Sequence, residues 1–592
     1  MYDPSENDLS FAIKHGLDAE MRALLETRFD LGDDLVDAVL SEAGRVARDV
    51  IAPLNQSGDI TGSVWNSDFT VTTPAGFKEA HRAMAEGGWC GIEAGEEHGG
   101  QGMSKVISTS VAEMWHGANM AFALCSLLSQ GQIHALEVFG TPAQKATYLP
   151  KLASGAWTGT MNLTEPQAGT DLGALKTSAK PDKDGEYRIK GQKIFITYGE
   201  HDMAENIVHL VLARVEGAPE GIKGISLFIV PKILTNEDGS LGARNDVKCV
   251  SLEHKLGINA SPTAVLQFGE DEGAIGYLVG EENQGLSIMF KMMNHARFGV
   301  GVQGLAMANR AFMAAKAYAG ERVQGIPLDG KAGDTIDRHP DVMRLLAGMR
   351  SEIEAMRGMM IYTAGAIDLA DNQLGDTAYW QSRAELMIPI LKAWLTERSV
   401  ALASDGVQVH GGMGFIEETG AAQHYRDARI LPIYEGTTAI QANDMMYRKT
   451  LRDQGVGVRA LLADISASAT TAMASDNSDI SATGRALAAA CETAEDALGT
   501  VLAGGLSMRH AGAVSVPYLM MLGTLTGGWM ALRSASAAAA QAESAHWDAT
   551  FLSAKQKLAR VFADHSLPEV ARYSQIIQSG GAAVENITPE ML

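Results

Sequence analysis

Two short segments in the third quarter of the chain carry residues that could bind a flat or phosphorylated ligand. The first is Gln408-Val-His410-Gly411-Gly412-Met-Gly414-Phe415, whose adjacent glycines allow a phosphate or a ring to approach the backbone closely. The second is Tyr434-Glu435-Gly436-Thr437-Thr438, in which Glu435 lies just before a predicted helix with a threonine cap. From the local sequence alone, a solvated or capping carboxylate is the more frequent interpretation of Glu435.

Two earlier segments add hydroxyls and an aromatic ring. The first, Met161-Asn-Leu163-Thr164-Glu165-Pro166-Gln-Ala-Gly169-Thr170-Asp171, contains a bend that exposes backbone N–H groups beside hydroxyls, although an ordinary surface turn fits equally well. The second, Lys193-Ile-Phe195-Ile-Thr197, is predicted to be a strand whose alternation places Lys193, Phe195 and Thr197 on one face. An aromatic next to a hydroxyl could flank a flat ring, and core packing is the alternative for Phe195.

A GxGxxG pattern occurs at Gly299-Val-Gly301-Val-Gln-Gly304. A dinucleotide-binding fingerprint needs a strand before this pattern and a helix after it. Here the pattern lies inside one long helical stretch, so we interpret the glycines as sites of close helix packing and reject the dinucleotide fold.

The predicted elements that must position these segments change type along the chain. Apolar residues at three- and four-residue spacing predict helices over residues 1–160. Short β-branched or alternating runs over 161–283 predict antiparallel strands, because their connections are too short for parallel crossovers. Residues 284–452 and 453–592 are again helical in pattern. We therefore predict an α+β multidomain fold with an N-terminal helical domain, a central β-domain, a C-terminal helical domain and a helical extension.

Within this layout three segments carry more specific expectations. Residues 24–55 are predicted to form a helix that Pro53 ends. Residues 465–484 are rich in Ser, Ala and Thr and suggest a linker or a weakly packed connection. Residues 511–532 carry no charge and are about long enough to span a bilayer. Pro517 and three glycines interrupt this last stretch, so we favour a helix buried in a soluble bundle and no integral membrane span.

Composition limits the classes of partner. The chain has 592 residues and a formal charge of −23, which makes broad nucleic-acid binding improbable because that requires a basic surface. The four cysteines, Cys90, Cys125, Cys249 and Cys491, are far apart and include no CxxC pair, so we expect neither a disulfide scaffold nor a cysteine-rich metal site. The acidic N-terminal segment shows no secretory or transit signal, and we expect a cytoplasmic protein.

Taken together, the segments LTEPQAGTD, KIFIT, QVHGGMGF and YEGTTAIQ resemble the acyl-CoA dehydrogenase family, in whose members they occur in this order. The resemblance covers roughly residues 10–450. It implies an N-terminal helical domain, a central β-domain and a C-terminal four-helix bundle, with FAD between the last two. The region after residue 450 resembles that of long-form members, most of all the bacterial 3-methylmercaptopropionyl-CoA dehydrogenase branch.

The resemblance also implies roles for individual residues. Glu435 matches the catalytic base that removes the α-proton of an acyl thioester, and Tyr434, Gly436 and Arg297 match positions near the substrate. Thr170 matches a contact to both flavin phosphate and substrate, and Phe195 stands where many members have tryptophan beside the flavin. The remaining positions that match FAD contacts are Met161, Leu163, Thr164, Thr197, Arg322, Gln324, Gln408, Gly412 and Thr437.

Of these, Arg322, Gln408 and Gly412 match contacts to the FAD of a neighbouring subunit, which implies a homodimer or a dimer of dimers. Two positions depart from the family pattern. Gly325 stands where members commonly have phenylalanine, which puts the adenine-side packing in doubt, and Ala439 stands where some have glutamine. Neither departure affects the residues that do the chemistry.

The resemblance implies FAD-dependent oxidation of an acyl-CoA to a 2,3-enoyl-CoA, with electrons passed to electron-transfer flavoprotein. The acyl group is expected to be 3-methylmercaptopropionyl or another short or medium chain. One alternative is an acyl-CoA oxidase, in which oxygen accepts the electrons. Another is a DNA-binding, non-dehydrogenase member of the fold, against which the net charge argues.

Overall fold

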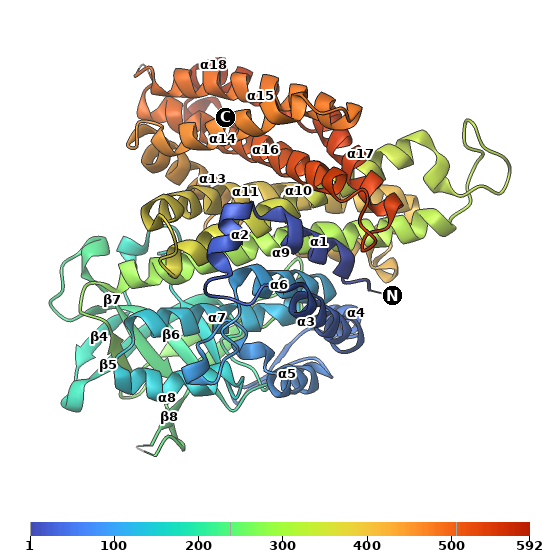
Figure 1. Ribbon diagram of the computed structural model, residues 1–592. Coiled ribbons are helices and arrows are strands. Elements are labelled where there is room, and N and C mark those ends of the chain that lie inside the picture. The colour runs from blue at the N-terminus through green and yellow to red at the C-terminus, as the bar shows by residue number, and fades with distance from the viewer. Residues whose placement is uncertain (1, 237, 505) are drawn as a thin grey trace. The chain divides into compact units, whose positions relative to one another are not determined.

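The computed structural model describes residues 2–236, 238–504 and 506–592 (Figure 1). These residues divide into two compact units. The first, the sheet unit, comprises residues 43–104 and 118–299. The second, the helical unit, comprises residues 2–42, 105–117 and 300–592. Each unit is described by itself below.

Helices dominate the first 160 residues, as the periodicity predicts. Side-chain caps begin several of them: Asn119 accepts a hydrogen bond from Phe122 N at 3.1 Å, and Thr141 forms a capping box with Gln144. The α-helices are α1 (Glu6–Gly16), α2 (Ala19–Leu25), α3 (Asp33–Val46), α4 (Leu54–Thr61), α5 (Phe77–Glu86), α6 (Lys105–Ala118), α7 (Met120–Phe139) and α8 (Pro142–Ala153).

The predicted single helix over residues 24–55 is wrong. The chain forms α2 and α3 with a break between them, because Asp30 Oδ1 accepts the backbone N–H of Gly32 and stabilises a turn there. Pro53 does end a helical run, as predicted, because α3 continues as a π-helix over Ala47–Ile51 whose C-cap, Ala52, directly precedes Pro53. Pro53 also precedes α4 as the residue at its N-cap, where the missing N–H costs nothing.

One large sheet forms the body of the sheet unit, with the strand order β10-β11-β5-β12-β7-β6-β3 and β4 paired with β5 and β6. Two short hairpins, β1 with β2 and β8 with β9, lie outside it. The strands are β1 (Val64–Trp65), β2 (Val71–Thr72), β3 (Trp157–Asn162), β4 (Ser178–Pro181), β5 (Glu186–Thr197), β6 (Asn206–Val215), β7 (Ile225–Pro231), β8 (Ile233–Thr235), β9 (Leu241–Arg244), β10 (Val247–Leu252), β11 (Thr263–Phe268) and β12 (Ala274–Val279).

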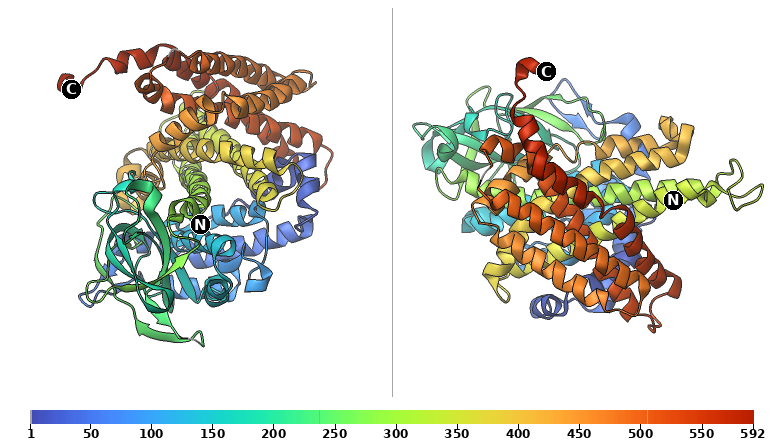
Figure 2. Two further views of the ribbon diagram at one scale, coloured as in Figure 1. Left: turned by 90° about the vertical axis from the view of Figure 1, so that its left-hand side faces the viewer. Right: turned by 90° about the horizontal axis from the view of Figure 1, so that it is seen from above.

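The sheet is mostly antiparallel, as predicted, but two of its pairs are parallel. β6 pairs with β3 and with β4 in the parallel sense. Other strands intervene between β3 and β6, so the returning chain is long enough for a parallel pairing. Apolar side chains cover both faces: Trp157 and Met161 pack in one cluster with Leu210, whereas Val211 and Phe228 pack in another. α7 and α8 lie against β3, and Figure 2 shows the strong curvature of the sheet.

Long helices make up the helical unit. α16 packs against α10, α11, α17 and α18, so the extension after residue 452 and the helices before it share one core. The helices after the sheet are α9 (Gly285–Glu321), α10 (Pro340–Asp371), α11 (Thr377–His410), α12 (Ala421–Ala428), α13 (Thr438–Asn443), α14 (Val456–Met473), α15 (Ser478–Leu502), α16 (Met508–Ala540), α17 (Ala549–His565) and α18 (Glu569–Glu585). The first part of α9, up to residue 299, belongs to the sheet unit.

The glycine pattern at residues 299–304 lies inside α9, as predicted, and serves helix packing. A Cβ on Gly301 would lie 2.0 Å from Leu391 Cδ2, and one on Gly304 would lie 2.9 Å from the Leu395 backbone. Both neighbours are on α11, so only glycine permits the observed approach of the two helices. The pattern therefore has no dinucleotide-binding role here.

The expected linker at residues 465–484 is wrong. α14 continues to Met473, and α15 begins at Ser478 after a short turn in which Asn477 caps the helix. Ile465 and Ile480 are buried, so the Ser- and Ala-rich composition reflects close helix packing rather than a loose connection. Residues 511–532 lie in α16, which is buried along most of its length. Within the described residues, no helix is long and apolar enough to cross a membrane.

A buried network of ion pairs, here called the charge network, joins the two ends of the chain inside the helical unit. Lys555 on α17 donates to Asp8 on α1 at 2.8 Å and to Glu354 on α10 at 2.6 Å. Arg350 also contacts Asp8 at 2.6 Å, and Arg357 pairs with Glu113. The Lys555 side chain is 3% exposed, so its charge depends on these carboxylates for solvation.

Candidate active site

The sheet unit positions the KIFIT segment through a bulge in β5. Thr197 and Ile196 pair with Thr263 and Ala264 on β11, and the next pair is Lys193 with Leu266. Two residues of β5 therefore stand opposite one residue of β11. Phe195, inside the bulge, has a φ of 61°, a left-handed conformation that a bulky residue rarely adopts.

The bulge overturns the prediction that Lys193, Phe195 and Thr197 share a face. The ring of Phe195 is 57% exposed, whereas Lys193 is completely buried. Regular alternation would have placed both on the same side of the strand, but the extra residue reverses the side-chain direction. A large aromatic ring held open in a strained conformation is a platform for a flat ligand.

The LTEPQAGTD segment is attached to this bulge. Ile194 N donates to Thr164 O at 2.9 Å, and Lys193 Nζ donates to Leu163 O at 2.9 Å. The predicted FAD contacts at the end of β3 and in β5 are thus brought together. Met161 is buried in β3, Leu163, Thr164 and Thr197 are half-buried, and Thr170 is exposed in the loop. Their hydroxyls and backbone groups can hydrogen-bond the polar edge of a flat ring.

Glu165 is the centre of that loop. Burial by itself raises its pKa, but the Lys193 ammonium and hydrogen bonds from Thr177 and the Lys176 backbone outweigh burial and hold the pKa at about 2. The carboxylate is therefore ionised at neutral pH. Arg297, the predicted substrate contact, belongs to the same unit, where it is half-buried in the first part of α9.

The helical unit holds Glu435 on a strained loop. Glu435 has a φ of 55° and Gly436 a φ of 91°, so two successive residues are left-handed. Thr437 then caps α13, as predicted, by accepting a hydrogen bond from Ile440 N at 3.4 Å. The loop is short, and the Glu435 side chain is half-buried beside Tyr434. Backbone strain of this kind persists only where the surroundings fix it.

Lys392 helps to fix the strained loop that carries Glu435. Its ammonium, on the buried helix α11, donates to Gly436 O at 2.8 Å. Gln441 Nε2 lies 3.4 Å from the carbonyls of both Glu435 and Gly436. Lys392 is completely buried, so its position is set by the helix core rather than by solvent.

Tyr434 is anchored from α9. Its hydroxyl donates to Gln303 Oε1, and Gln303 is completely buried. Burial raises the pKa of Tyr434, and the charges of Glu435 and Asp427 raise it further, so the hydroxyl keeps its proton and remains a donor. Among the described residues, Gln303 Nε2 is a buried amide nitrogen with no hydrogen-bond partner.

A third group of predicted FAD contacts lies on the surface of the helical unit. Arg322, Gln324, Gln408 and Gly412 are all exposed. The ends of α9 and α11 that carry them lie side by side, because the rings of Tyr318 and His410 stack with centroids 4.6 Å apart. The structure thus brings these four residues to one region of the helical unit.

The backbone conformation at residue 325 accounts for the presence of glycine where the family commonly has phenylalanine. Its φ of 68° lies in the left-handed region, where a phenylalanine would be strained. Gln324 O is held by a 2.9 Å hydrogen bond with His339 Nε2, which fixes this turn. The turn after Arg322 therefore follows a path that favours glycine.

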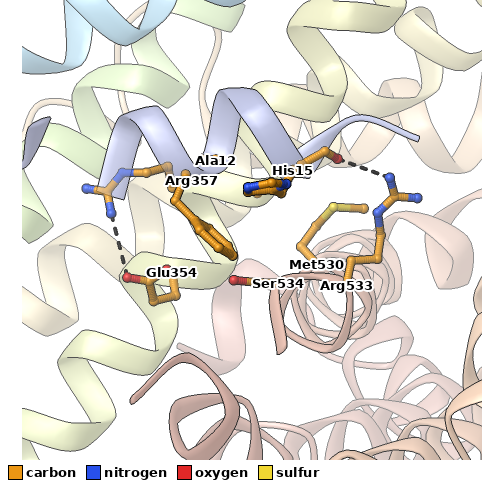
Figure 3. Close-up of a pocket in the computed structure, with 10 residues that line it drawn as sticks. Ala12, His15, Glu354, Arg357, Met530, Arg533 and Ser534 are labelled. Atoms are coloured by element: carbon orange, nitrogen blue, oxygen red, sulfur yellow. Dashed lines mark hydrogen bonds and ion pairs between the residues drawn. The ribbon is translucent and has the colours of Figure 1, made fainter. Parts of the chain in front are cut away.

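A small cavity lies elsewhere in the helical unit, between α1, α10 and α16. Arg357 and Glu354 lie at one end of it and Arg533 and Met530 at the other, with His15 between them (Figure 3). Its volume of about 20 Å³ is room for a single water molecule. The cavity is too small for an acyl chain and adjoins the charge network. Among the described residues, no cluster of three or more His, Cys, Asp or Glu side chains could hold a metal ion.

Sequence comparison decides the family. Four family models match consecutive parts of the chain: acyl-CoA dehydrogenase N-terminal domain (38–156), middle domain (160–270) and C-terminal domain (283–449), and acetyl-CoA dehydrogenase C-terminal like (461–588). The 3-methylmercaptopropionyl-CoA dehydrogenase of Ruegeria pomeroyi is 48% identical, with 98% of each chain covered. The chain belongs to the acyl-CoA dehydrogenase family. It is an enzyme of the long form, with the expected fold of three domains and a helical extension.

Other relatives agree with this assignment. The broad-specificity linear acyl-CoA dehydrogenase FadE5 of Mycobacterium tuberculosis is 35% identical over 93% of both chains. Among solved structures, Caenorhabditis elegans ACDH-11 in complex with C11-CoA has a TM-score of 0.79, covers 100% of this chain and 96% of its own, and is 19% identical. Butyryl-CoA dehydrogenase from Megasphaera elsdenii has a TM-score of 0.56 at 26% identity, covering 73% of this chain and 99% of its own.

The sequence motifs did not predict four residues that contact the segments of the candidate site: Glu165, Lys193, Gln303 and Lys392. Lys392 left one signal, since it is the single charged residue within the apolar run Leu386–Leu395. Gln303 has no such signal in the sequence, because a polar residue between small helix-packing residues is also typical of an exposed position. Glu165 and Lys193 were visible inside their motifs, but only the bulge shows that they face each other.

Proposed function

We propose that this enzyme oxidises an acyl-CoA thioester to the 2,3-enoyl-CoA with FAD as cofactor and Glu435 as the base. FAD, when bound, accepts a hydride from the β-carbon. Glu435 removes the α-proton, and its carboxylate must be placed beside that carbon. The observation that carries the proposal is the strained loop, which Lys392 fixes at the residue after the base.

The residues of the sheet unit fit a flavin. An exposed aromatic ring at Phe195 lies on the same strand as the Thr197 hydroxyl, and the strand is bonded to the segment that carries Thr164. We assign the ring of FAD to these residues, together with the backbone of Met161 and Leu163. Thr170, in the exposed part of the loop, is assigned to the flavin phosphate and the substrate.

Charge develops on the thioester oxygen as the α-proton leaves, and it needs a hydrogen-bond donor. The backbone N–H of Glu435 supplies one in our scheme, and the left-handed φ of 55° sets its direction. Tyr434 and Gly436 flank the acyl group on either side of the base. Bound substrate expels water from Glu435, which favours the neutral carboxyl and makes the carboxylate a stronger base.

Among acyl groups we propose 3-methylmercaptopropionyl, on the strength of the 48% identity over 98% of the Ruegeria pomeroyi enzyme. Identity of this extent covers all four domains rather than the core alone. Electron-transfer flavoprotein is the proposed acceptor. The cluster of Arg322, Gln324, Gln408 and Gly412 on the surface supports a homodimer in which each subunit contacts the FAD of the other.

Anaerobic flavin bleaching tests the reaction and the substrate together. The purified protein is mixed with butyryl-, octanoyl-, palmitoyl- and 3-methylmercaptopropionyl-CoA, and the loss of flavin absorbance is followed. We expect the fastest bleaching with 3-methylmercaptopropionyl-CoA. Faster bleaching by one of the others would correct the substrate, and no bleaching by any of them would refute the reaction.

The acceptor is tested in air. Reduced enzyme is supplied with electron-transfer flavoprotein or with oxygen alone, and hydrogen peroxide is measured. We expect turnover only with the flavoprotein. Peroxide formed at the turnover rate without it would identify an acyl-CoA oxidase instead.

A further inference from the structure

We infer that Lys193 and Glu165 are positioning residues that hold the flavin-contacting segment Leu163–Thr170 against strand β5. The inference rests on the proposed function, since it assigns a task to residues that do not themselves contact the flavin. It goes beyond that function by naming what fixes the flavin side of the site.

Lys193 contacts the Leu163–Thr170 segment at two points. Its ammonium donates to Leu163 O at 2.9 Å and to Glu165 Oε1 at 2.8 Å, so one side chain bonds both the backbone and the side chain of the segment. The side chain is completely buried. An ammonium cannot remain in such a place without partners of this kind, so the contact is fixed rather than transient.

Several donors converge on Glu165. Besides Lys193, its two oxygens accept from Thr177 Oγ1 at 2.5 Å, Thr177 N at 3.0 Å, Lys176 N at 2.7 Å and Gln167 Nε2 at 2.6 Å. Its backbone N–H and carbonyl also bond Ala168. The carboxylate therefore ties the segment to the start of β4 as well as to β5.

Lys193 also lies at the edge of the bulge in β5. Lys193 is the residue at which the β5–β11 pairing is interrupted, and Phe195 follows two residues later with its ring exposed. The bulge turns the Lys193 side chain inward and the Phe195 ring outward at the same time. It also lets Ile194 N donate to Thr164 O, so one backbone irregularity fixes both the Leu163–Thr170 segment and the exposed ring.

An ion pair is a costly way to fill the interior, because apolar residues of the same volume are often at least as stable. A charged pair adds directional specificity, because an ammonium and a carboxylate form good hydrogen bonds in only a few relative orientations. Burial lowers the pKa of Lys193 to about 8, against the opposing effect of the Glu165 carboxylate. The pair thus favours one loop position, although apolar residues could fill the same space with at least equal stability.

FAD affinity of the full-length chain, freed of FAD and titrated with it, tests the inference. The variants are Lys193→Met, Lys193→Met combined with Glu165→Gln, and Lys190→Met as the control. Lys190 is an exposed lysine on the same strand. The thermal stability of each FAD-free protein and the visible spectrum of bound flavin are measured alongside.

We expect Lys193→Met to weaken FAD binding by about tenfold to a hundredfold, because a misplaced loop loses oriented contacts. It also destabilises the FAD-free protein, since Glu165 is left without its counter-charge. The double variant should regain part of that stability, because no uncompensated charge remains, but not the affinity, because Leu163 O still lacks its donor. Lys190→Met should change neither quantity.

Two results would overturn the inference: wild-type affinity and flavin spectrum in Lys193→Met, or recovery of affinity together with stability in the double variant. The second would mean that the pair serves stability alone. If Lys193→Met does not fold, the double variant decides by itself. A wild-type chain that binds no FAD would refute the proposed function instead, so the two failures are distinguishable.

Discussion

A buried lysine holds a loop of the site in each unit, and the two lysines do so differently. Lys193 in the sheet unit donates to a backbone carbonyl and a carboxylate, and Lys392 in the helical unit donates to the carbonyl of Gly436. Lys193 extends from a strand interrupted by a bulge, and Lys392 extends from a continuous helix. Both side chains are completely buried.

The difference follows from what each loop must present. The loop in the sheet unit has to offer several weak contacts to a large cofactor, so its whole course is fixed, through Glu165 and the start of β4. In the proposed function the loop of the helical unit presents one carboxylate, and Lys392 and Gln441 fix the carbonyls beside it. Changes in the first unit should therefore alter FAD binding, and changes in the second should alter the rate of reaction.

Within the helical unit, Glu435→Gln is the substitution with the largest expected effect on the rate of reaction. It keeps the size of the side chain but removes the base, so the rate of flavin reduction should fall by about 10²–10⁴-fold or more. FAD affinity should stay at the wild-type value. Rapid mixing with substrate under anaerobic conditions measures the rate, and rapid bleaching in this variant would reject Glu435 as the base.

Lys392→Met is expected to have the next largest effect. It removes the closer of two donors to Gly436 O, leaving only the 3.4 Å contact from Gln441, and loosens the strained loop, so flavin reduction should slow by about tenfold to a hundredfold. FAD affinity should not change, in contrast to Lys193→Met. Lys316→Met, at an exposed position of α9, is the matched control. An unchanged rate, or weaker FAD binding with an unchanged rate, would contradict the comparison.

Phe195→Ala tests the aromatic platform of the sheet unit. Loss of one ring contact corresponds to about 0.5–1.5 kcal/mol, so FAD affinity should weaken roughly three- to tenfold. Phe69→Ala is the control, since Phe69 is also an exposed aromatic at positive φ, in this case 66°. Equal effects of the two substitutions in a fluorescence titration would show that the platform has no special role.

The smallest expected effect is a dependence of stability on pH. The pKa of Glu165 is held at about 2, below its ordinary value of 4.5, so its carboxylate stabilises the folded state fully above about pH 4.5. That contribution is lost progressively as the pH falls toward 2. The difference in unfolding temperature between wild type and Glu165→Gln should therefore narrow below pH 4.5. Glu216→Gln, at an exposed position, should show no such trend.

Much of the fold follows from patterns that the sequence displays locally. Apolar periodicity predicts the helices and strands, and the small residues at Gly301 and Gly304 correctly predict close helix packing in place of a nucleotide site. The predicted linker fails because Ser and Ala are frequent both in loops and at tight helix contacts, and only the neighbouring helix distinguishes them.

The site was less accessible to such reasoning. The positions proposed for FAD and substrate come from four motifs in register, but the orientation of Lys193 and Phe195 depends on a bulge created by pairing with β11. Strict alternation cannot reveal a bulge. Lys392 and Gln303 contribute through contacts to residues more than 40 positions away in the chain, and no local pattern records such contacts.

The charge network has a consequence for how the chain is made. Asp8 is synthesised 547 residues before Lys555, with which it pairs in the network together with Arg350. Until α17 has been synthesised, the carboxylates of Asp8 and Glu354 share Arg350 without the lysine. The interior of the helical unit is therefore completed only once α17 has been synthesised, and we expect a chain cut before residue 549 to be less stable than the full chain.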